Sequence, residues 1–175
     1  MNTKPEKIIK RITKAVSQRQ SVLLIGEWDE KLIKGIKENQ NSITQSTNNN
    51  EISNLPDNSF TRIIMDYSRD VSCNVSTIQD TISFYKEVRR LLLPTGIIII
   101  SANCELNFFE RLFKKEQPNT PKIKPKVLQD QIHDNGFLID GYYGYPGEHL
   151  LMMAQIINKE VSTLFSSEEQ ETISL

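Results

Sequence analysis

Short apolar runs recur along the chain, and between them apolar residues return every three or four positions. A continuous apolar run is typical of a strand buried on both faces, whereas the three-to-four spacing is typical of an amphipathic helix. The runs predict strands at 21–26, 42–46, 62–65, 97–100, 137–143 and 149–157, of which 42–46 is the weakest. The helical spacings predict helices at 5–18, from Asp29 or Glu30 to about 36, and at 78–93, 107–114 and 126–135.

Polar and turn-forming residues separate these elements. Apart from the weak strand, residues 38–54 contain too few apolar side chains to order themselves by burial. Leu55–Phe60 contains residue types that favour a turn. Pro94-Thr95-Gly96 is expected to end the helix that precedes it. Three prolines predict a loop at 117–125, and Tyr145-Pro146-Gly147 predicts a turn between the last two strands.

Strands that alternate with helices and end in a hairpin-like pair predict an α/β fold. Its sheet is mainly parallel with an antiparallel C-terminal edge, and right-handed crossovers place helices on both faces. Ligands of such sheets bind beyond the carboxyl ends of the strands. The expected rim is formed by residues 26–29, 46–48, 66–67 and 101–103.

The chain has 175 residues and a net charge of −1, so overall charge indicates no partner class. Its distribution suggests three parts: a basic amphipathic helix at 1–20, a domain at 21–158 and a mobile acidic tail at 159–175. Cys73 and Cys104 have no spacing typical of a metal or redox pair, and no apolar run approaches the ~20 residues of a membrane span. We therefore expect a cytoplasmic protein with free thiols.

Two basic segments each allow two interpretations. The N-terminal helix could lie on a membrane or along phosphates, but we favour a helix packed on the domain with solvated lysines. Residues 111–126 carry six Lys or Arg against Glu116 and the preceding Glu110, near three phenylalanines, Phe108, Phe109 and Phe113. This segment is either a basic lid for an acidic ligand or a solvated surface loop.

Three segments resemble a known family in their order along the chain. They are Leu55-Pro-Asp-Asn-Ser-Phe60 before a strand, Val88-Arg-Arg-Leu-Leu-Leu-Pro-Thr-Gly96 before the isoleucine strand, and His133-Asp-Asn-Gly-Phe137 before the last strands. In this order they resemble class I S-adenosylmethionine (SAM)-dependent methyltransferases, especially the small-molecule branch called type 11. The resemblance covers about Val22 to Ile157 and implies a Rossmann-like methyltransferase sheet.

The resemblance also locates a cofactor site, in which most of the family's residues are replaced. In the family, the first strand ends in an acidic residue and is followed by a glycine-rich loop that approaches the cofactor. Here Leu24 stands in place of the acid, and Trp28 and Glu30 stand in place of later glycines. Only Gly26 remains, next to Glu27. At the second strand, Thr47 and Asn48 stand where an acid binds the ribose hydroxyls. The stretch between that strand and Pro56 is also short, so one helix/strand unit is expected to be trimmed. Trp28 either fills the vacated pocket, which we favour, or stacks on an adenine.

Other candidate residues have plain structural alternatives. Asp66 and Tyr67 match rim positions near the transferred methyl group, but we favour the interpretation that Asp66 caps the following turn. Glu148 and His149 could form an acid–base pair, although a turn residue and a strand-edge histidine is the interpretation we favour. His133 near a helix end is explained by the helix dipole. No metal-ligand spacing is present.

The leading functional hypothesis is a pseudoenzyme: a methyltransferase-like domain that binds SAM weakly or not at all and serves a protein partner as scaffold or regulator. The first alternative is a divergent, active SAM-dependent methyltransferase acting on a small or acidic acceptor. The second is a peripheral binder of phosphates, nucleic acid or a membrane surface through the two basic segments, for which the support is weaker.

Overall fold

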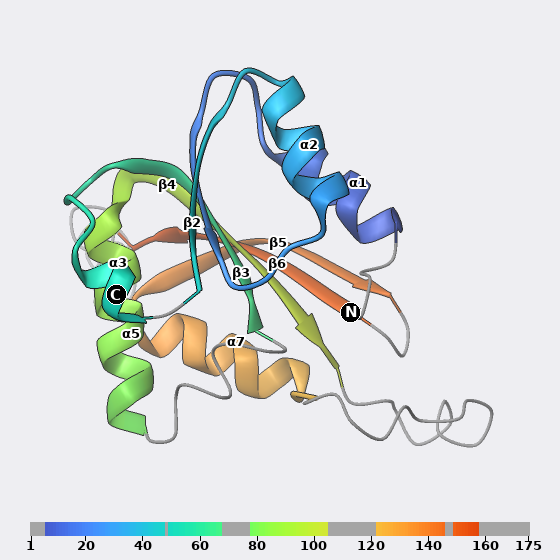
Figure 1. The fold of residues 1–175 in the computed structure, drawn as a ribbon. Helices are drawn as coiled ribbons and strands as arrows, with labels where there is room; N and C mark the ends of the chain where they lie inside the picture. Colours follow the sequence, from blue (N-terminus) through green and yellow to red (C-terminus); the bar gives the residue numbers. More distant parts are fainter. Residues whose placement is uncertain (1–5, 48, 68–77, 105–121, 146–148, 158–175) are drawn as a thin grey trace, which may run out of the picture.

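In the computed structural model, residues 6–47, 49–67, 78–104, 122–145 and 149–157 are described, and their strands form one six-stranded sheet (Figure 1). The strands are β1 (Ser21–Ile25), β2 (Ser42–Ser46), β3 (Phe60–Asp66), β4 (Leu92–Asn103), β5 (Phe137–Tyr145) and β6 (His149–Ile156). The helices are α1 (Glu6–Ala15), α2 (Glu30–Glu38), α3 (Asn49–Ser53), α5 (Ile78–Leu91) and α7 (Pro125–Asp134).

The strand order is β2-β1-β3-β4-β6-β5. The first four strands are parallel, and β6 runs antiparallel to both β4 and β5. This confirms the predicted Rossmann-like sheet with an antiparallel C-terminal edge. Between β2 and β3 the chain forms only the five-residue α3, which agrees with the predicted trimming of a helix/strand unit.

The central strands are buried on both faces because their side chains alternate between two helical layers. Leu23, Ile63 and Ile98 are neighbours in register and belong to the core cluster on the side of α3, α5 and α7. The next row of the same register consists of Leu24, Ile64 and Ile99, and it packs in the cluster formed with α1 and α2. The apolar runs thus have no polar side, as their sequence predicts.

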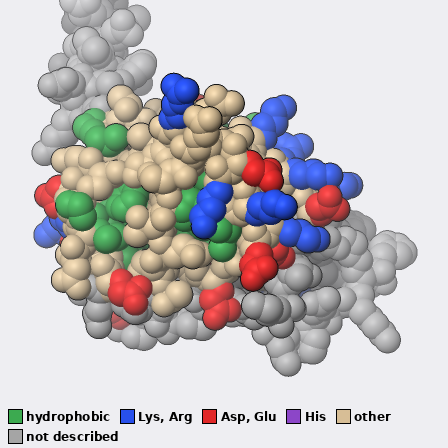
Figure 2. Space-filling model, turned by 45° about the horizontal axis from the view of Figure 1, so that its top comes forward, with side chains coloured by type: hydrophobic (Ala, Val, Ile, Leu, Met, Phe, Trp, Pro, Cys, Tyr) green, Lys and Arg blue, Asp and Glu red, His purple; other side chains and the backbone are tan. Residues whose placement is uncertain are grey.

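Helix α1 is packed on the domain, which confirms the interpretation we favoured. Ile8, Ile12 and Val16 are buried against the sheet layer and α2. Its cations lie outside, where Lys10 pairs with Glu6 at 2.9 Å and the Arg11 guanidinium lies 4.6 Å from the centre of the Tyr143 ring. Figure 2 shows Lys and Arg gathered on one side of the molecule. No helix within the described ranges is long and apolar enough to cross a membrane.

Four local predictions are corrected. Helix α5 ends at Leu91, and β4 continues through Pro94 because Leu92 already pairs with Phe60 before a register shift. The helical spacing places Ile82 on the apolar stripe of α5 with Tyr85 and Val88, but Ile82 is 46% exposed, whereas Phe84 is buried in the core. Residues 49–53 form α3 because a single side chain, Ile52, reaches the core. Pro125 begins α7, where a missing N–H is tolerated, and does not end the loop.

Several sequence predictions lie outside the described residues. These are the helix at 107–114, most of the loop at 117–125, the centre of the turn at 145–147 and the mobile tail at 159–175. The division of the chain into 1–20, 21–158 and 159–175 also stays a prediction.

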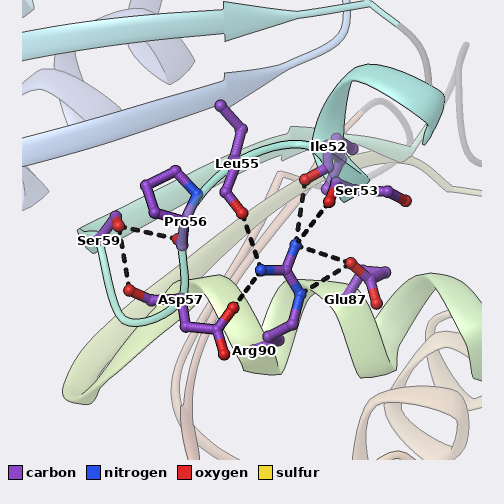
Figure 3. A network of polar contacts seen from close by, with 8 residues as sticks. All are labelled: Ile52, Ser53, Leu55, Pro56, Asp57, Ser59, Glu87 and Arg90. Atoms are coloured by element: carbon purple, nitrogen blue, oxygen red, sulfur yellow. Dashed lines mark hydrogen bonds and ion pairs between the residues drawn. The ribbon is translucent and has the colours of Figure 1, made fainter.

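Arg90, in the last turn of α5, joins this helix to the segment that precedes β3 (Figure 3). Its guanidinium donates to the carboxylates of Asp57 and Glu87 and to the main-chain carbonyls of Ile52, Ser53 and Leu55. Hydrogen bonds to Asp57 and then Glu87 raise the pKa of Arg90. The hydroxyl of Ser59 closes the same turn by donating to the carbonyl of Pro56 at 2.8 Å. One side chain therefore holds together two of the three segments that resemble the family.

Replacing Arg90 is expected to destabilise the domain. Arg90→Met removes hydrogen bonds to two carboxylates and leaves main-chain carbonyls without a donor, so the free energy of unfolding should fall by about 2–4 kcal/mol. Lysine cannot reach as many acceptors as the planar guanidinium, so Arg90→Lys should recover only part of this loss. Urea denaturation measures both. Arg89→Met, at an exposed neighbouring position, is the control, and an equal effect of the two Met variants would contradict the clamp.

Tyr85 is fully buried in the cluster on the α5 side, between the rings of Phe84 and Phe137. Its hydroxyl has no hydrogen-bond partner among the residues described. Burial, followed by the nearby Tyr67, raises the pKa of Tyr85 well above its ordinary value. The ring packs in the core, whereas the hydroxyl forms no hydrogen bond with a described residue.

Tyr85→Phe should therefore leave stability at neutral pH unchanged or raise it by about 1–2 kcal/mol. The raised pKa also sets a pH dependence. Below about pH 10 the hydroxyl is protonated in both states; above it only the unfolded state ionises, so stability falls as pH rises. The variant should lose less stability than the wild type in that range. Urea denaturation at neutral and alkaline pH tests this, and a clearly less stable variant would show that the hydroxyl has a partner.

Candidate functional site

The carboxyl ends of β1, β2, β3 and β4 meet at one edge of the sheet. Ile25 lies in register with Ser46 on one side and Met65 on the other, and Asp66 lies in register with Ser101. This edge brings together the predicted rim residues Gly26, Thr47 and Asp66 from three different strand ends. Asn48 lies outside the described residues.

Gly26 forms the turn that leads from β1 to α2. Its φ of +102° is in the region that favours glycine, and its N–H donates to the carbonyl of Ser46 at 2.8 Å. The contact between β1 and β2 therefore continues one residue beyond the strand. Gly26 is itself buried, whereas the next residue, Glu27, is exposed.

Trp28 is turned into the core. It is 8% exposed and packs in the cluster that contains Leu24 and Leu32, on the side of α1 and α2. Its indole Nε1–H donates to the carbonyl of Ile25 at 3.1 Å, so the polar atom of the ring is satisfied inside the turn. Asp29 then caps α2 by accepting from the N–H of Lys31 at 2.8 Å. The β1–α2 turn is thus built around a tryptophan.

The end of β2 carries a carboxylate that the sequence analysis missed. Glu51 of α3 reaches back, and its Oε2 accepts the hydroxyl of Ser46 at 3.0 Å and the N–H of Thr47 at 3.1 Å. Ser46 is buried, whereas Thr47 is exposed. In the sequence, Glu51 follows three residues after the polar Asn48, which is the spacing of a capping box and was the available signal. An acid therefore lies beside this strand end although the strand does not end in one.

The end of β3 holds the two candidate catalytic residues in different surroundings. Asp66 is 5% exposed and lies beside the buried Ser101. Tyr67 donates its hydroxyl to Oε1 of Gln131 in α7 at 2.8 Å. Burial raises the pKa of Tyr67, with the Gln131 hydrogen bond opposing it, so the phenol stays protonated at neutral pH. This contact ties the end of β3 to α7.

Three further residues with possible chemical roles are His149, His133 and Cys104. His149 begins β6 opposite Asn103 and so lies at the same edge as Asp66, whereas Glu148 is outside the described residues. His133 is exposed in the last turn of α7. Burial raises the pKa of Cys104 to about 11, which makes it a poor nucleophile. Within the described ranges, no three His, Cys, Asp or Glu side chains are grouped as a metal site would require.

Comparison with known proteins gives one consistent result at the level of fold. No family model matches the sequence, and no curated protein matches it either. Among solved structures, a SAM-dependent methyltransferase from Archaeoglobus fulgidus has a TM-score of 0.64 and 9% identity, over 85% of this chain and 91% of that one. The Burkholderia thailandensis 1,6-didemethyltoxoflavin-N1-methyltransferase, with 1,6-didemethyltoxoflavin and S-adenosylhomocysteine bound, has a TM-score of 0.62 and 13% identity over 87% and 80%.

A third structure, a SAM-dependent methyltransferase from Aquifex aeolicus, has a TM-score of 0.56 and 15% identity over 85% of this chain and 89% of that one. The chain therefore has the fold of class I SAM-dependent methyltransferases, as the order of its three sequence segments predicts. At these identities the likeness concerns the fold alone.

The buried position of Trp28 has a direct spectroscopic consequence. It is the only tryptophan in the chain, so the fluorescence of the native protein should be blue-shifted and weakly quenched by acrylamide. Trp28→Ala should lower the free energy of unfolding by about 3–5 kcal/mol, because it empties a filled site in the core. Trp28→Phe keeps most of the apolar volume and is the matched control, with a smaller loss. Strong acrylamide quenching of the folded protein would show that the ring is open to solvent.

Proposed function

We propose that this chain is a methyltransferase-fold domain in which SAM binding is weakened or lost, and that it acts as a scaffold or regulatory partner of another protein. The observation that carries the proposal is the burial of Trp28 in the β1–α2 turn. In the family this turn is a glycine-rich loop that lets the backbone approach the cofactor. Here the same turn is filled by an indole ring whose N–H bonds to Ile25.

The neighbouring positions support the same proposal. Leu24, where the family has an acid, is fully buried in the cluster with Trp28 and has no atom that can accept a hydrogen bond. Glu30, where a later glycine is expected, begins α2. A lost hydrogen bond to a charged partner costs about 1.5–3 kcal/mol, so two of them weaken binding by a factor on the order of 100 or more.

The active enzyme remains the second candidate because of Glu51. Its carboxylate lies beside the end of β2, near the place where the family's acid binds the ribose hydroxyls. Gly26 also keeps its positive φ, and Asp66 lies at the end of the adjacent strand. In this alternative SAM is the cofactor, Glu51 holds its ribose and Asp66 orients or deprotonates a small or acidic acceptor. Tyr67, bound to Gln131, would then support the rim and not take part in chemistry.

A peripheral binder of phosphates or membranes has less support. The apolar face of α1 is buried against the domain and is not available to a bilayer. The exposed lysines of α1 and α2 alternate with acids such as Glu6, Glu30 and Glu38, which is typical of a solvated surface. The second basic segment, 111–126, lies mostly outside the described residues.

Calorimetric titration with SAM, and with S-adenosylhomocysteine as a second ligand, separates the two candidates. We expect no saturable heat up to millimolar cofactor; micromolar binding would overturn the proposal. If binding is found, Gly26→Trp should abolish it, because a side chain at this turn is both strained and in the way.

Glu51→Gln refines the alternative. It keeps the size of the side chain but removes the charge, so ribose binding through Glu51 predicts about tenfold weaker cofactor binding. A capping role alone predicts a small loss of stability with unchanged binding. Glu38→Gln, at an exposed position in the last turn of α2, is the matched control for loss of one surface charge.

A further inference from the structure

A groove lies at the opposite edge of the sheet from the rim. Its wall contains Asn58, which precedes β3, Leu92, which begins β4, Asn135, which precedes β5, and Ile156, which ends the antiparallel β6. These positions all belong to the amino-terminal edge of the parallel strands. The volume of the groove is about 590 Å³. It is therefore separate from the candidate cofactor site.

The groove combines an apolar floor with a cationic side. Leu92, Pro94 and Ile156 line it, together with the partly exposed Ile82. Asp134 of α7 is the one acidic residue among the described residues of the lining, so the lining is cationic on balance. From α5, the exposed Lys86 and Arg89 face the same space. Neither forms an ion pair with a described side chain, in contrast to the neighbouring Arg90, which is engaged by Asp57 and Glu87.

Gly136 lies beside one of these cations. It has a φ of +82°, and a β-carbon built on it would lie 2.5 Å from Nη1 of Arg89. The guanidinium therefore lies close to the α7–β5 turn, in space that a side chain at position 136 would share.

The chain itself leads into this groove. Ile156 lines it, and the N–H of the next residue, Ile157, donates to the carbonyl of Gly136 at 3.0 Å. The residues that follow, 158–175, contain four glutamates and one lysine, so their charge is opposite to that of the groove. They also contain Val161, Leu164 and Phe165 at the three-to-four spacing of one helix face.

We propose that residues 158–175 fold back into this groove, with their glutamates against Lys86 and Arg89 and their apolar residues over Ile82 and Pro94. Residues 158–175 are the best supported occupant of the groove because the chain connects them directly to Ile157. A short flexible connection holds a segment at an effective concentration on the order of millimolar, so even weak contacts fill the groove. An external acidic partner must bind without this advantage. The proposal goes beyond the proposed function and holds whether or not SAM binds.

A paramagnetic label near the end of the full chain tests this. In a Cys73→Ser background, Ser174→Cys carries a nitroxide, and Cys104 is left in place because it is buried. We expect the label to broaden the amide signals of residues 86–90 and 135–136 in the ¹⁵N-labelled protein. The same amides should lose this broadening when Glu168, Glu169 and Glu171 are all changed to Lys. Absence of broadening in the starting protein, or its persistence after charge reversal, would overturn the proposal.

Variants of the groove provide the reciprocal test. Lys86→Glu with Arg89→Glu should abolish the broadening, and combining it with the three tail reversals should restore it, because the charges are then opposite again. Lys34→Glu with Lys37→Glu on α2 is the matched control and should change nothing. Circular dichroism verifies that each variant is folded. If nitroxide-labelled ¹⁴N protein broadens unlabelled ¹⁵N protein as strongly, the segment comes from a second copy, which contradicts folding back within one chain.

Discussion

The burial of β4 between β3 and β6, with a helical layer on each face, is the constraint on which the rest of the structure depends. Ile98 and Ile100 point to the layer of α5 and α7, while Ile99 points to the layer of α1 and α2. A strand that is apolar on both faces is stable only when both faces are covered, so the two layers are required together. The parallel direction of β1, β3 and β4 then follows from the helices that connect them, and it gathers their carboxyl ends at one edge.

At that edge, the β1–α2 turn takes part in core packing. A glycine-rich loop leaves space between backbone and ligand, whereas Trp28 fills the β1–α2 turn and adds its apolar area to the core that includes Leu24 and α1. Burying a large aromatic side chain stabilises the fold by a few kcal/mol. The buried indole therefore stabilises the domain. Under the proposed function it also leaves less room for a ligand, whereas Glu51, Gly26 and Asp66 support the alternative of an active enzyme.

Much of the fold could be predicted from the sequence because burial leaves a clear pattern of apolar residues. The strands appear as continuous apolar runs, and the longer helices appear as apolar residues every three or four positions. The parts that failed depend on contacts distant in sequence. Helix α3 exists because Ile52 reaches the core, and Ile82 is exposed because Phe84 points inward more directly. At the site, the positions of Gly26 and Asp66 followed from strand ends, but Glu51 did not, because its carboxylate returns to β2 through a helix too short to predict. Trp28 could be assigned to the turn, but its burial with Leu24 and Leu32 depends on how α1 and α2 pack on the sheet.

The three sequence segments that resemble the methyltransferase family are largely structural, and Arg90 explains why. It lies in the second segment and binds Asp57 and Leu55 of the first, so these two occur together because one clamp needs both. The third segment contains Gly136, which has a positive φ just after α7. Its carbonyl accepts a hydrogen bond from the N–H of Ile157, the residue after β6. None of these contacts touches the rim. A chain can therefore keep all three segments, and with them the fold, while the residues at the carboxyl edge change. In this chain, the residues that carry the resemblance to the family and the residues of the candidate cofactor site are separate sets, at opposite edges of the same sheet.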